Sequence, residues 1–180
     1  MDFSYSEVQQ MLQDSVKKFV SKNYDFDTRS KIIESEAGYS KENWQLFAEL
    51  GWLAVPLSEE DGGLGGSAVD LMVMMEEFGK ANLVEPFLPS AVIGGSLVAE
   101  LATNDQKSQI LEKVVGGNLQ LAYASAETGS RFNVSKVATS AEAKGDDIVI
   151  NGKKIAVLNG PNADQLLVCA RERGGESDAD

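Results

Sequence analysis

The 180-residue sequence contains no histidine and only one cysteine. Without histidine, neither a Ser-His-Asp triad nor a Cys-His pair can be built, and a catalytic zinc site is disfavoured. The lone Cys169 excludes an intramolecular disulfide, which is typical of proteins from a reducing compartment. It stands in the apolar run 166–170. We therefore predict a buried structural thiol at this position and not a nucleophile.

Basic residues are also scarce, because 16 Lys and Arg face 28 Asp and Glu and leave a net charge of −12. Nucleic-acid binding depends on cationic surfaces, so the charge argues against a nucleic-acid partner, and it equally disfavours anionic membrane surfaces. No apolar run reaches membrane-spanning length, and the polar N-terminal stretch MDFSYSEVQQ is unlike a signal peptide. We expect a cytoplasmic protein without a membrane partner.

The patterning of apolar residues divides the chain near Gly116–Gly117. Over residues 1–117 they recur at helical spacing, which predicts an all-α domain of four or five helices, one of them over 90–102. The predicted N-cap residues are Ser4, Ser40, Ser67 with Asp70 three residues later, and Asn104 or Asp105. The adjacent Glu76 and Glu77 point about 100° apart on a helix and cannot face one substrate, so we predict a solvated face there.

A loop with four glycines separates two of these helices. Gly62, Gly63, Gly65 and Gly66 flank Leu64 and permit positive φ and close approach of neighbouring backbone. The loop lacks the following lysine and the preceding strand of a phosphate-binding loop, so we interpret it as a tight connection between packed helices. Trp44 and Trp52 stand among apolar residues and are predicted to lie in the core.

Residues 118–180 have strand-like patterning and form the second predicted domain. We expect strands over 119–125, 137–143, 147–150, 155–158 and 165–171. Residues 144–146 would join the second and third strands, and Asn151–Gly152 is predicted to form a type I′ hairpin turn. Because no helices alternate with the strands, the sequence predicts an antiparallel barrel or sandwich that is not completed. The expected fold class is therefore α+β.

Two motifs carry a family resemblance, EEDGGLGGS over 59–67 and EEFGKA over 76–81. Residue by residue, they resemble motifs of the helical N-terminal domain of the acyl-CoA dehydrogenase family. The resemblance extends along the whole chain and implies a fragment of a longer protein, with a helical domain and a truncated antiparallel β-barrel domain. It implies FAD as cofactor, an acyl-CoA substrate oxidised at its α,β bond, reoxidation by an electron-transfer flavoprotein, and a homo- or hetero-oligomer. No catalytic residue is assigned, since the family's base lies in a C-terminal helical bundle.

Two further segments resemble the flavin-binding motifs of that family. Residues 121–130, LAYASAETGS, stand in place of YxxTEPGxGSD, and residues 151–160, NGKKIAVLNG, in place of NGxKxWITNG. The resemblance assigns cofactor contacts to Tyr123, Ser125, Ala126, Glu127, Gly129, Ser130, Ala156, Val157 and Leu158. It also assigns Ser130 to the acyl-thioester pocket.

Three of these positions depart from the family pattern. Ala126 and Leu158 replace threonines that contact the flavin, and Ala156 replaces the tryptophan that covers it. The loss of a ring and two hydroxyls weakens stacking and tuning of a flavin. An alternative therefore remains open, in which the chain belongs to a degenerate partner subunit of a heteromeric acyl-CoA dehydrogenase, like the small subunit of the pimeloyl-CoA type, with weak or no flavin binding.

Overall fold

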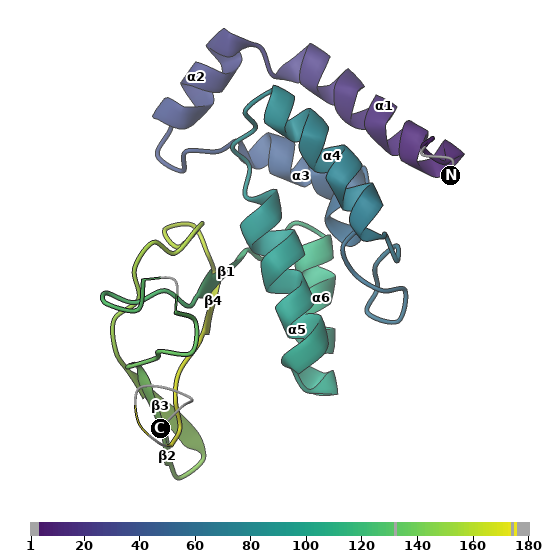
Figure 1. The fold of residues 1–180 in the computed structure, drawn as a ribbon. Helices are drawn as coiled ribbons and strands as arrows, with labels where there is room; N and C mark the ends of the chain where they lie inside the picture. Colours follow the sequence, from purple (N-terminus) through teal and green to yellow (C-terminus); the bar gives the residue numbers. More distant parts are fainter. Residues whose placement is uncertain (1–3, 132, 174, 176–180) are drawn as a thin grey trace. The chain divides into compact units, whose positions relative to one another are not determined.

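The computed structural model describes residues 4–131, 133–173 and 175, and the chain divides into two compact units, 1–119 and 120–180 (Figure 1). The first unit is built from helices. They are α1 (Glu7–Asn23), α2 (Phe26–Glu34), α3 (Lys41–Glu49), the 3₁₀ helix η1 (Trp52–Ala54), α4 (Ala68–Lys80), the π-helix η2 (Phe87–Gly94), α5 (Gly95–Leu101) and α6 (Asn104–Val115). None of the described helices combines the length and the apolar content that crossing a bilayer requires.

Aromatic side chains form the centre of the first unit. Phe47 stacks on Phe78 with ring centroids 5.7 Å apart, and Phe19 meets Trp52 edge-on at 5.5 Å. Such pairs contribute about 0.5–1.5 kcal/mol beyond the burial of their area. Trp44 and Trp52 are both buried, so the prediction that they lie in the core is confirmed.

The four-glycine loop folds tightly against the chain segment around η1. Its main-chain N–H groups at residues 63–66 donate to carbonyls of residues 54–58. Gly62 and Gly65 have φ angles of 82° and 64°, whereas a Cβ on Gly63 or Gly66 would collide with the backbone of Leu57 or Val55. Both predicted uses of glycine, positive φ and close approach, are therefore present and alternate along the loop.

Helix capping follows the predicted residues at two helices and departs from them at two others. Ser40 caps α3, and Ser67 forms a capping box with Asp70 at the start of α4, as predicted. Helix α1, however, begins at Ser6 in a capping box with Gln9 and not at Ser4, and Thr103 caps α6 in place of Asn104 or Asp105. In both corrected cases, a hydroxyl with a glutamine three residues later provides the reciprocal pair of hydrogen bonds.

The predicted solvated face at Glu76–Glu77 is wrong for one of the two residues. Glu77 is buried, accepts a 3.0 Å hydrogen bond from Gln13 and forms an ion pair with Lys80 at 2.8 Å, while Glu76 stays exposed. The burial results from the packing of α1 along α4 (Figure 1). Lys80 on the same helix and Gln13 on α1 compensate the buried carboxylate, and the spacing of residues along α4 alone does not reveal the contribution of α1.

The helix predicted over 90–102 starts earlier and has two parts. The π-helix η2 begins at Phe87 and passes into α5 at Gly95. Pro89 is tolerated because it lies in the first turn, where its missing N–H is not needed. Phe87 is buried in the core, in keeping with a packing role.

The second unit contains two small sheets. Strand β1 (Leu121–Ala124) pairs in parallel with β4 (Gln165–Val168), and β2 (Ser140–Lys144) pairs antiparallel with β3 (Asp147–Asn151). The expected antiparallel barrel is therefore not what the described residues of this unit form. The long connection between β1 and β4 permits parallel pairing without a crossover helix.

The hairpin turn lies at Gly145–Asp146, within the connection predicted for residues 144–146, and not at Asn151–Gly152. Gly145 has a φ of 66°, whereas Gly152 lacks the positive φ that a type I′ turn needs. Gly152 instead lies so close to Thr139 that a Cβ would collide with it. The strand expected over 155–158 is also absent, because Ala156 has a φ of 51° and turns the chain.

The environment of Cys169 also differs from the prediction. The thiol is partly exposed and not fully buried. The strand that precedes it ends at Val168, three residues before the predicted end at Arg171, although Arg171 still forms an isolated parallel bridge with Ser140.

Candidate functional site

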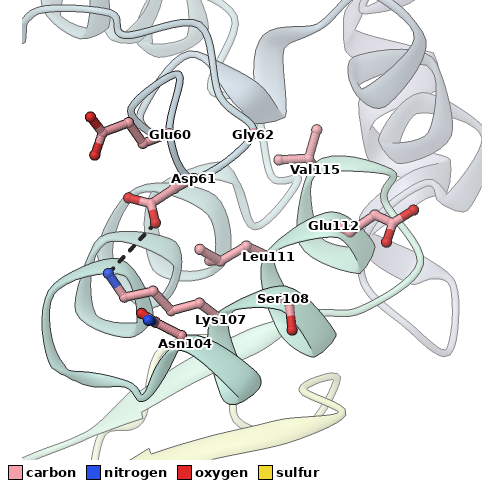
Figure 2. A pocket seen from close by; sticks show the side chains of 9 residues that line it. All are labelled: Glu60, Asp61, Gly62, Asn104, Lys107, Ser108, Leu111, Glu112 and Val115. Carbon is pink, nitrogen blue, oxygen red and sulfur yellow. Dashed lines mark ion pairs between the residues drawn. The ribbon is translucent and has the colours of Figure 1, made fainter.

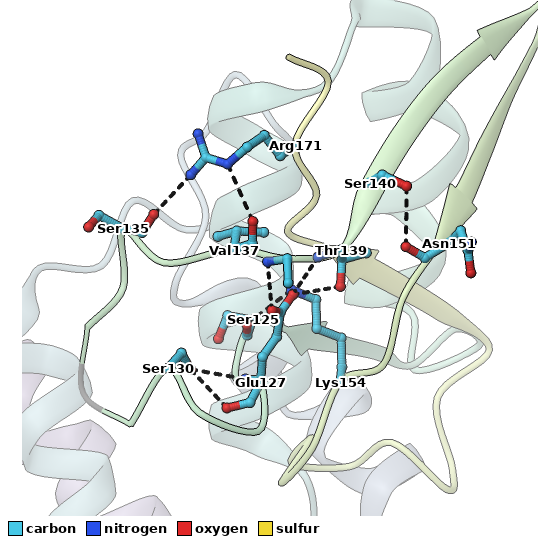
Figure 3. Close-up of polar contacts among 11 residues, drawn as sticks. Ser125, Glu127, Ser130, Ser135, Val137, Thr139, Ser140, Asn151, Lys154 and Arg171 are labelled. Carbon is cyan, nitrogen blue, oxygen red and sulfur yellow. Dashed lines mark hydrogen bonds and ion pairs between the residues drawn. The ribbon is translucent and has the colours of Figure 1, made fainter. Parts of the chain in front are cut away.

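Glu127 is the centre of the polar network in the second unit (Figure 3). One carboxylate oxygen accepts hydrogen bonds from the Thr139 hydroxyl at 2.6 Å and the Thr139 N–H at 3.0 Å. The other accepts from the N–H of Ala138 at 2.7 Å. Lys154 Nζ lies 2.7 Å from the first oxygen, and the side chains of Lys154 and Glu127 are only 8% and 7% exposed. The network joins the segment after β1 to the entry of β2 and to the chain beyond β3.

These donors set the ionisation of Glu127. The hydrogen bond from Lys154, followed by that from the Thr139 hydroxyl, lowers the pKa of the Glu127 carboxyl from 4.5 to about 2 against the opposing effect of desolvation. The group is therefore a carboxylate at neutral pH with every oxygen occupied. Such a group is a weak proton acceptor, and its geometry suits a structural anchor.

A tight turn follows Glu127. The Ser130 hydroxyl donates to the Glu127 carbonyl at 2.9 Å and accepts from the Glu127 N–H at 3.2 Å, and Gly129 has a φ of 95°. The hydroxyl that the resemblance assigned to cofactor and substrate is thus engaged within the turn. The two central residues, Thr128 and Gly129, are exposed, and their N–H groups make no hydrogen bond among the described residues.

The structure brings the two predicted cofactor segments together. The Ile155 N–H donates to the Ala126 carbonyl at 2.9 Å, and Lys154 Nζ donates to the Ser125 carbonyl at 3.1 Å. At the far end of the second segment, the Asn159 amide donates to the Leu121 carbonyl at 3.3 Å. Residues 125–127 and 154–155 are therefore held next to each other by hydrogen bonds.

The remaining predicted positions are more open. Tyr123 lies in β1, pairs with Leu167 and is partly exposed, while Leu158 is 63% exposed. The N–H groups of Ala156, Val157 and Leu158 have no acceptor among the described residues. Within 154–160 there is no aromatic ring. This donor set fits the polar edge of a flavin through main-chain amides and offers no ring to stack on it.

A pocket of about 380 Å³ adjoins the ion pair inside the second unit. Thr139 and Lys154 line its polar side, and Ile150, Leu166 and Val168 are among its apolar residues. The buried polar network thus has an apolar cavity directly next to it.

A larger pocket in the first unit, of about 590 Å³, lies between the four-glycine loop and α6 (Figure 2). Asp61 and Lys107 form an ion pair across it at 3.6 Å, with Glu60 and Glu112 also lining it. Its lining includes no residue of the two predicted cofactor segments. Paired and solvated charges account for its lining, so we do not assign it a chemical role.

Two residues of the network were not identified from the sequence. Thr139 was predicted only as a strand residue, and Lys154 was not distinguished from its neighbour Lys153. In the structure Lys153 is exposed, whereas the Lys154 side chain is only 8% exposed. The sequence signal was Gly152, because its missing Cβ allows the Thr139 side chain to approach.

Known proteins support the resemblance. The family model described as "Acyl-CoA dehydrogenase, N-terminal domain" matches residues 6–118. FadE12 of Mycobacterium tuberculosis, an acyl-CoA dehydrogenase, is 32% identical over 171 residues, which cover 94% of this chain and 43% of FadE12. The short-chain specific acyl-CoA dehydrogenase of Clostridium acetobutylicum is 30% identical, with 94% and 45% covered.

Solved structures agree with these matches. A chain of the ChsE4–ChsE5 complex from Mycobacterium tuberculosis aligns with a TM-score of 0.85 at 26% identity, covering 98% of this chain and 46% of that one. The FAD complex of PigA aligns with a TM-score of 0.83 at 26% identity, with 98% and 47% covered. The chain thus spans less than half the length of these relatives. Because the family model matches well over half of its residues, the chain belongs to the acyl-CoA dehydrogenase family.

Proposed function

We propose that this chain supplies the helical domain and the first part of the β domain of an FAD-dependent acyl-CoA dehydrogenase. The reaction is the introduction of an α,β double bond into an acyl-CoA thioester. The observation that carries the proposal is the linkage of residues 125–127 to residues 154–155, which holds both flavin-motif segments together. Beside them lie N–H groups that have no acceptor among the residues the structure describes.

The residues of this chain have distinct proposed roles toward FAD. The N–H groups of Thr128, Gly129 and residues 156–158 would hold the polar edge of the isoalloxazine ring, with Tyr123, Ser125 and Ala126 in the supporting strand and turn. Glu127 and Ser130 would shape the turn from within. When bound, FAD accepts the two electrons that leave the acyl chain.

Glu127 is not a candidate for the base that removes the substrate's α-proton. A useful base has a pKa near the working pH and a free oxygen that can reach the proton. The Glu127 carboxyl has a pKa of about 2 and is saturated by donors from Lys154, Thr139 and Ala138. We therefore propose that the base lies outside this chain.

The proposed partners follow from the family. We expect an acyl-CoA substrate, a cytoplasmic homo- or hetero-oligomer, and an electron-transfer flavoprotein that reoxidises FAD. An electron-transferring flavoprotein of Acidaminococcus fermentans is the subject of one matching structure, with a TM-score of 0.82.

The second candidate function is that of a degenerate partner subunit with weak or no flavin binding. Ala156 and Leu158 favour it, because neither offers the ring or the hydroxyl of the family motif. The match to a chain of the two-protein ChsE4–ChsE5 complex also supports it.

The two candidates differ in the flavin content of the purified full-length protein. Stoichiometric FAD that is bleached anaerobically by an acyl-CoA thioester would support the dehydrogenase. A colourless protein that gains flavin absorbance only after co-expression with a related subunit would support the partner role. A colourless protein that remains so with every related subunit would contradict both.

A further inference from the structure

Lys154 makes two partly buried polar contacts with the segment that follows β1. Its Nζ lies 2.7 Å from Glu127 Oε1 and 3.1 Å from the carbonyl of Ser125 (Figure 3). A charged amine and a carboxylate are retained at such low exposure only if each compensates the other and further hydrogen bonds satisfy both. Both conditions are met, since the Thr139 hydroxyl and the N–H groups of residues 138 and 139 complete the set.

The next residue provides a second attachment. The Ile155 N–H donates to the Ala126 carbonyl at 2.9 Å. A single hydrogen bond would act as a pivot, whereas attachments at two consecutive residues fix the direction in which the chain leaves. Ala156 then turns the chain with a φ of 51°, so the orientation of 156–158 is set directly by the two anchors.

We propose that Lys154 and Glu127 are positioning residues for the flavin. Their ion pair fixes the separation and orientation of the turn 127–130 and the segment 156–158. The N–H groups of both, which have no acceptor within the described part of the chain, can then meet one ligand. Neither side chain contacts the cofactor in this role. The inference rests on the proposed function, because it assigns these residues to the same FAD site.

The test compares Lys154→Met with Lys153→Met in the full-length protein. Both variants remove one positive charge from adjacent positions, but only Lys154 belongs to the buried network. For Lys154→Met we expect FAD affinity to fall by about 10- to 100-fold, as happens when an orienting outer partner is lost at metal sites. We also expect a changed visible circular dichroism of the bound flavin. Lys153→Met should match the wild type in both, and Lys154→Arg should recover part of the affinity.

A double variant separates positioning from stability. Lys154→Met combined with Glu127→Gln removes both charges, so that no unpaired charge is left buried, and the amide oxygen can still accept from Thr139. If the pair positions the flavin site, this variant should fold like the wild type but still bind FAD with lowered affinity. Without ligand, the Ile155 amide should exchange hydrogen faster than in the wild type. Wild-type affinity and circular dichroism in the folded double variant would overturn the proposal.

The outcomes also distinguish this inference from the proposed function. If the wild type binds FAD and Lys154→Met binds it equally well, the positioning role is wrong and the proposed function stands. If the wild type binds no FAD, alone or with a partner subunit, the proposed function fails and the positioning role fails with it. Slow hydrogen exchange at the Ile155 amide in the wild type would then show only that the hydrogen bond between Ile155 and Ala126 serves folding.

Discussion

The phenol of Tyr24 donates a 2.8 Å hydrogen bond to Glu85, and both side chains are buried. The same phenol oxygen accepts a 2.9 Å hydrogen bond from the Val84 N–H, and the other Glu85 oxygen accepts from the Asn43 amide at 3.0 Å. This arrangement joins the end of α1 to the start of α3 and to the segment before η2. Burial raises the pKa of Tyr24 well above its usual value, so the phenol remains a neutral donor.

Replacing this phenol should destabilise the helical unit. Tyr24→Phe leaves a buried Glu85 oxygen and the Val84 N–H without their partner, and we expect a loss of about 1–3 kcal/mol in the free energy of unfolding. Urea unfolding followed by the fluorescence of Trp44 and Trp52 measures it. Tyr5→Phe, at a partly exposed position, is the control and should change less than about 0.5 kcal/mol. Equal effects of the two changes would contradict the network.

Two glycines of the helical unit should respond in opposite directions to alanine. A Cβ at Gly63 would collide with the Leu57 main chain, so Gly63→Ala should destabilise by about 1–3 kcal/mol. Gly79 lies in α4 with free space around its Cα, so Gly79→Ala should stabilise by about 0.5–1 kcal/mol through helix propensity. Thermal unfolding monitored by circular dichroism checks both. A neutral Gly63→Ala would show that the loop relaxes without cost.

The stability of the second unit should fall in acid because of Glu127. Its folded pKa of about 2 lies below the ordinary 4.5, so the stabilisation is fully present above about pH 5 and is lost as the pH falls through about 2. Glu127→Gln cannot titrate and should have a flatter pH dependence in this window. NMR peak intensities of Thr139 and Ile155 in urea, recorded across the pH series, measure it. Parallel pH profiles of wild type and variant would exclude Glu127 as the source.

Restoring the threonine hydroxyl that the family motif has at position 158 should strengthen flavin binding with little loss of stability. Leu158 is largely exposed, so Leu158→Thr should change the free energy of unfolding by less than about 0.5 kcal/mol. One new hydrogen bond to the flavin would contribute about 1 kcal/mol, or roughly fivefold in FAD affinity. FAD titration of the full-length protein measures it, with Leu158→Ala as control. Equal affinities of the two variants would mean that this side chain does not face the cofactor.

Features that depend on a few neighbouring residues could be predicted from the sequence. The caps at Ser40 and Ser67 and the four-glycine loop follow from spacing within one turn or one loop. The N-cap of the first helix is predicted wrongly because Ser4 with Glu7 and Ser6 with Gln9 are two overlapping capping patterns, and the local sequence does not rank them. The structure contains the second.

Features that depend on distant residues could not be predicted in this way. Glu77 is buried by its contact with Gln13, which is 64 positions away. Gly152 carries a turn signal, yet its missing Cβ accommodates Thr139. At the candidate site, the resemblance singled out the segments 121–130 and 151–160, but only the fold distinguishes the Lys154 side chain, which is 8% exposed, from the exposed Lys153.

The parallel pairing of β1 with β4 has a consequence for the order of folding. The hairpin β2–β3 joins residues close in sequence and can form within microseconds, whereas Gln120 and Asp164 at the start of β1 and β4 are 44 positions apart. Closing so long a loop carries an entropic cost before any strand contact compensates it. Glu127 and Lys154 lie inside that loop, and their pairing shortens the chain still to be closed. We therefore expect the hairpin to form first within the second unit, and β1 to pair with β4 only after the ion pair has formed.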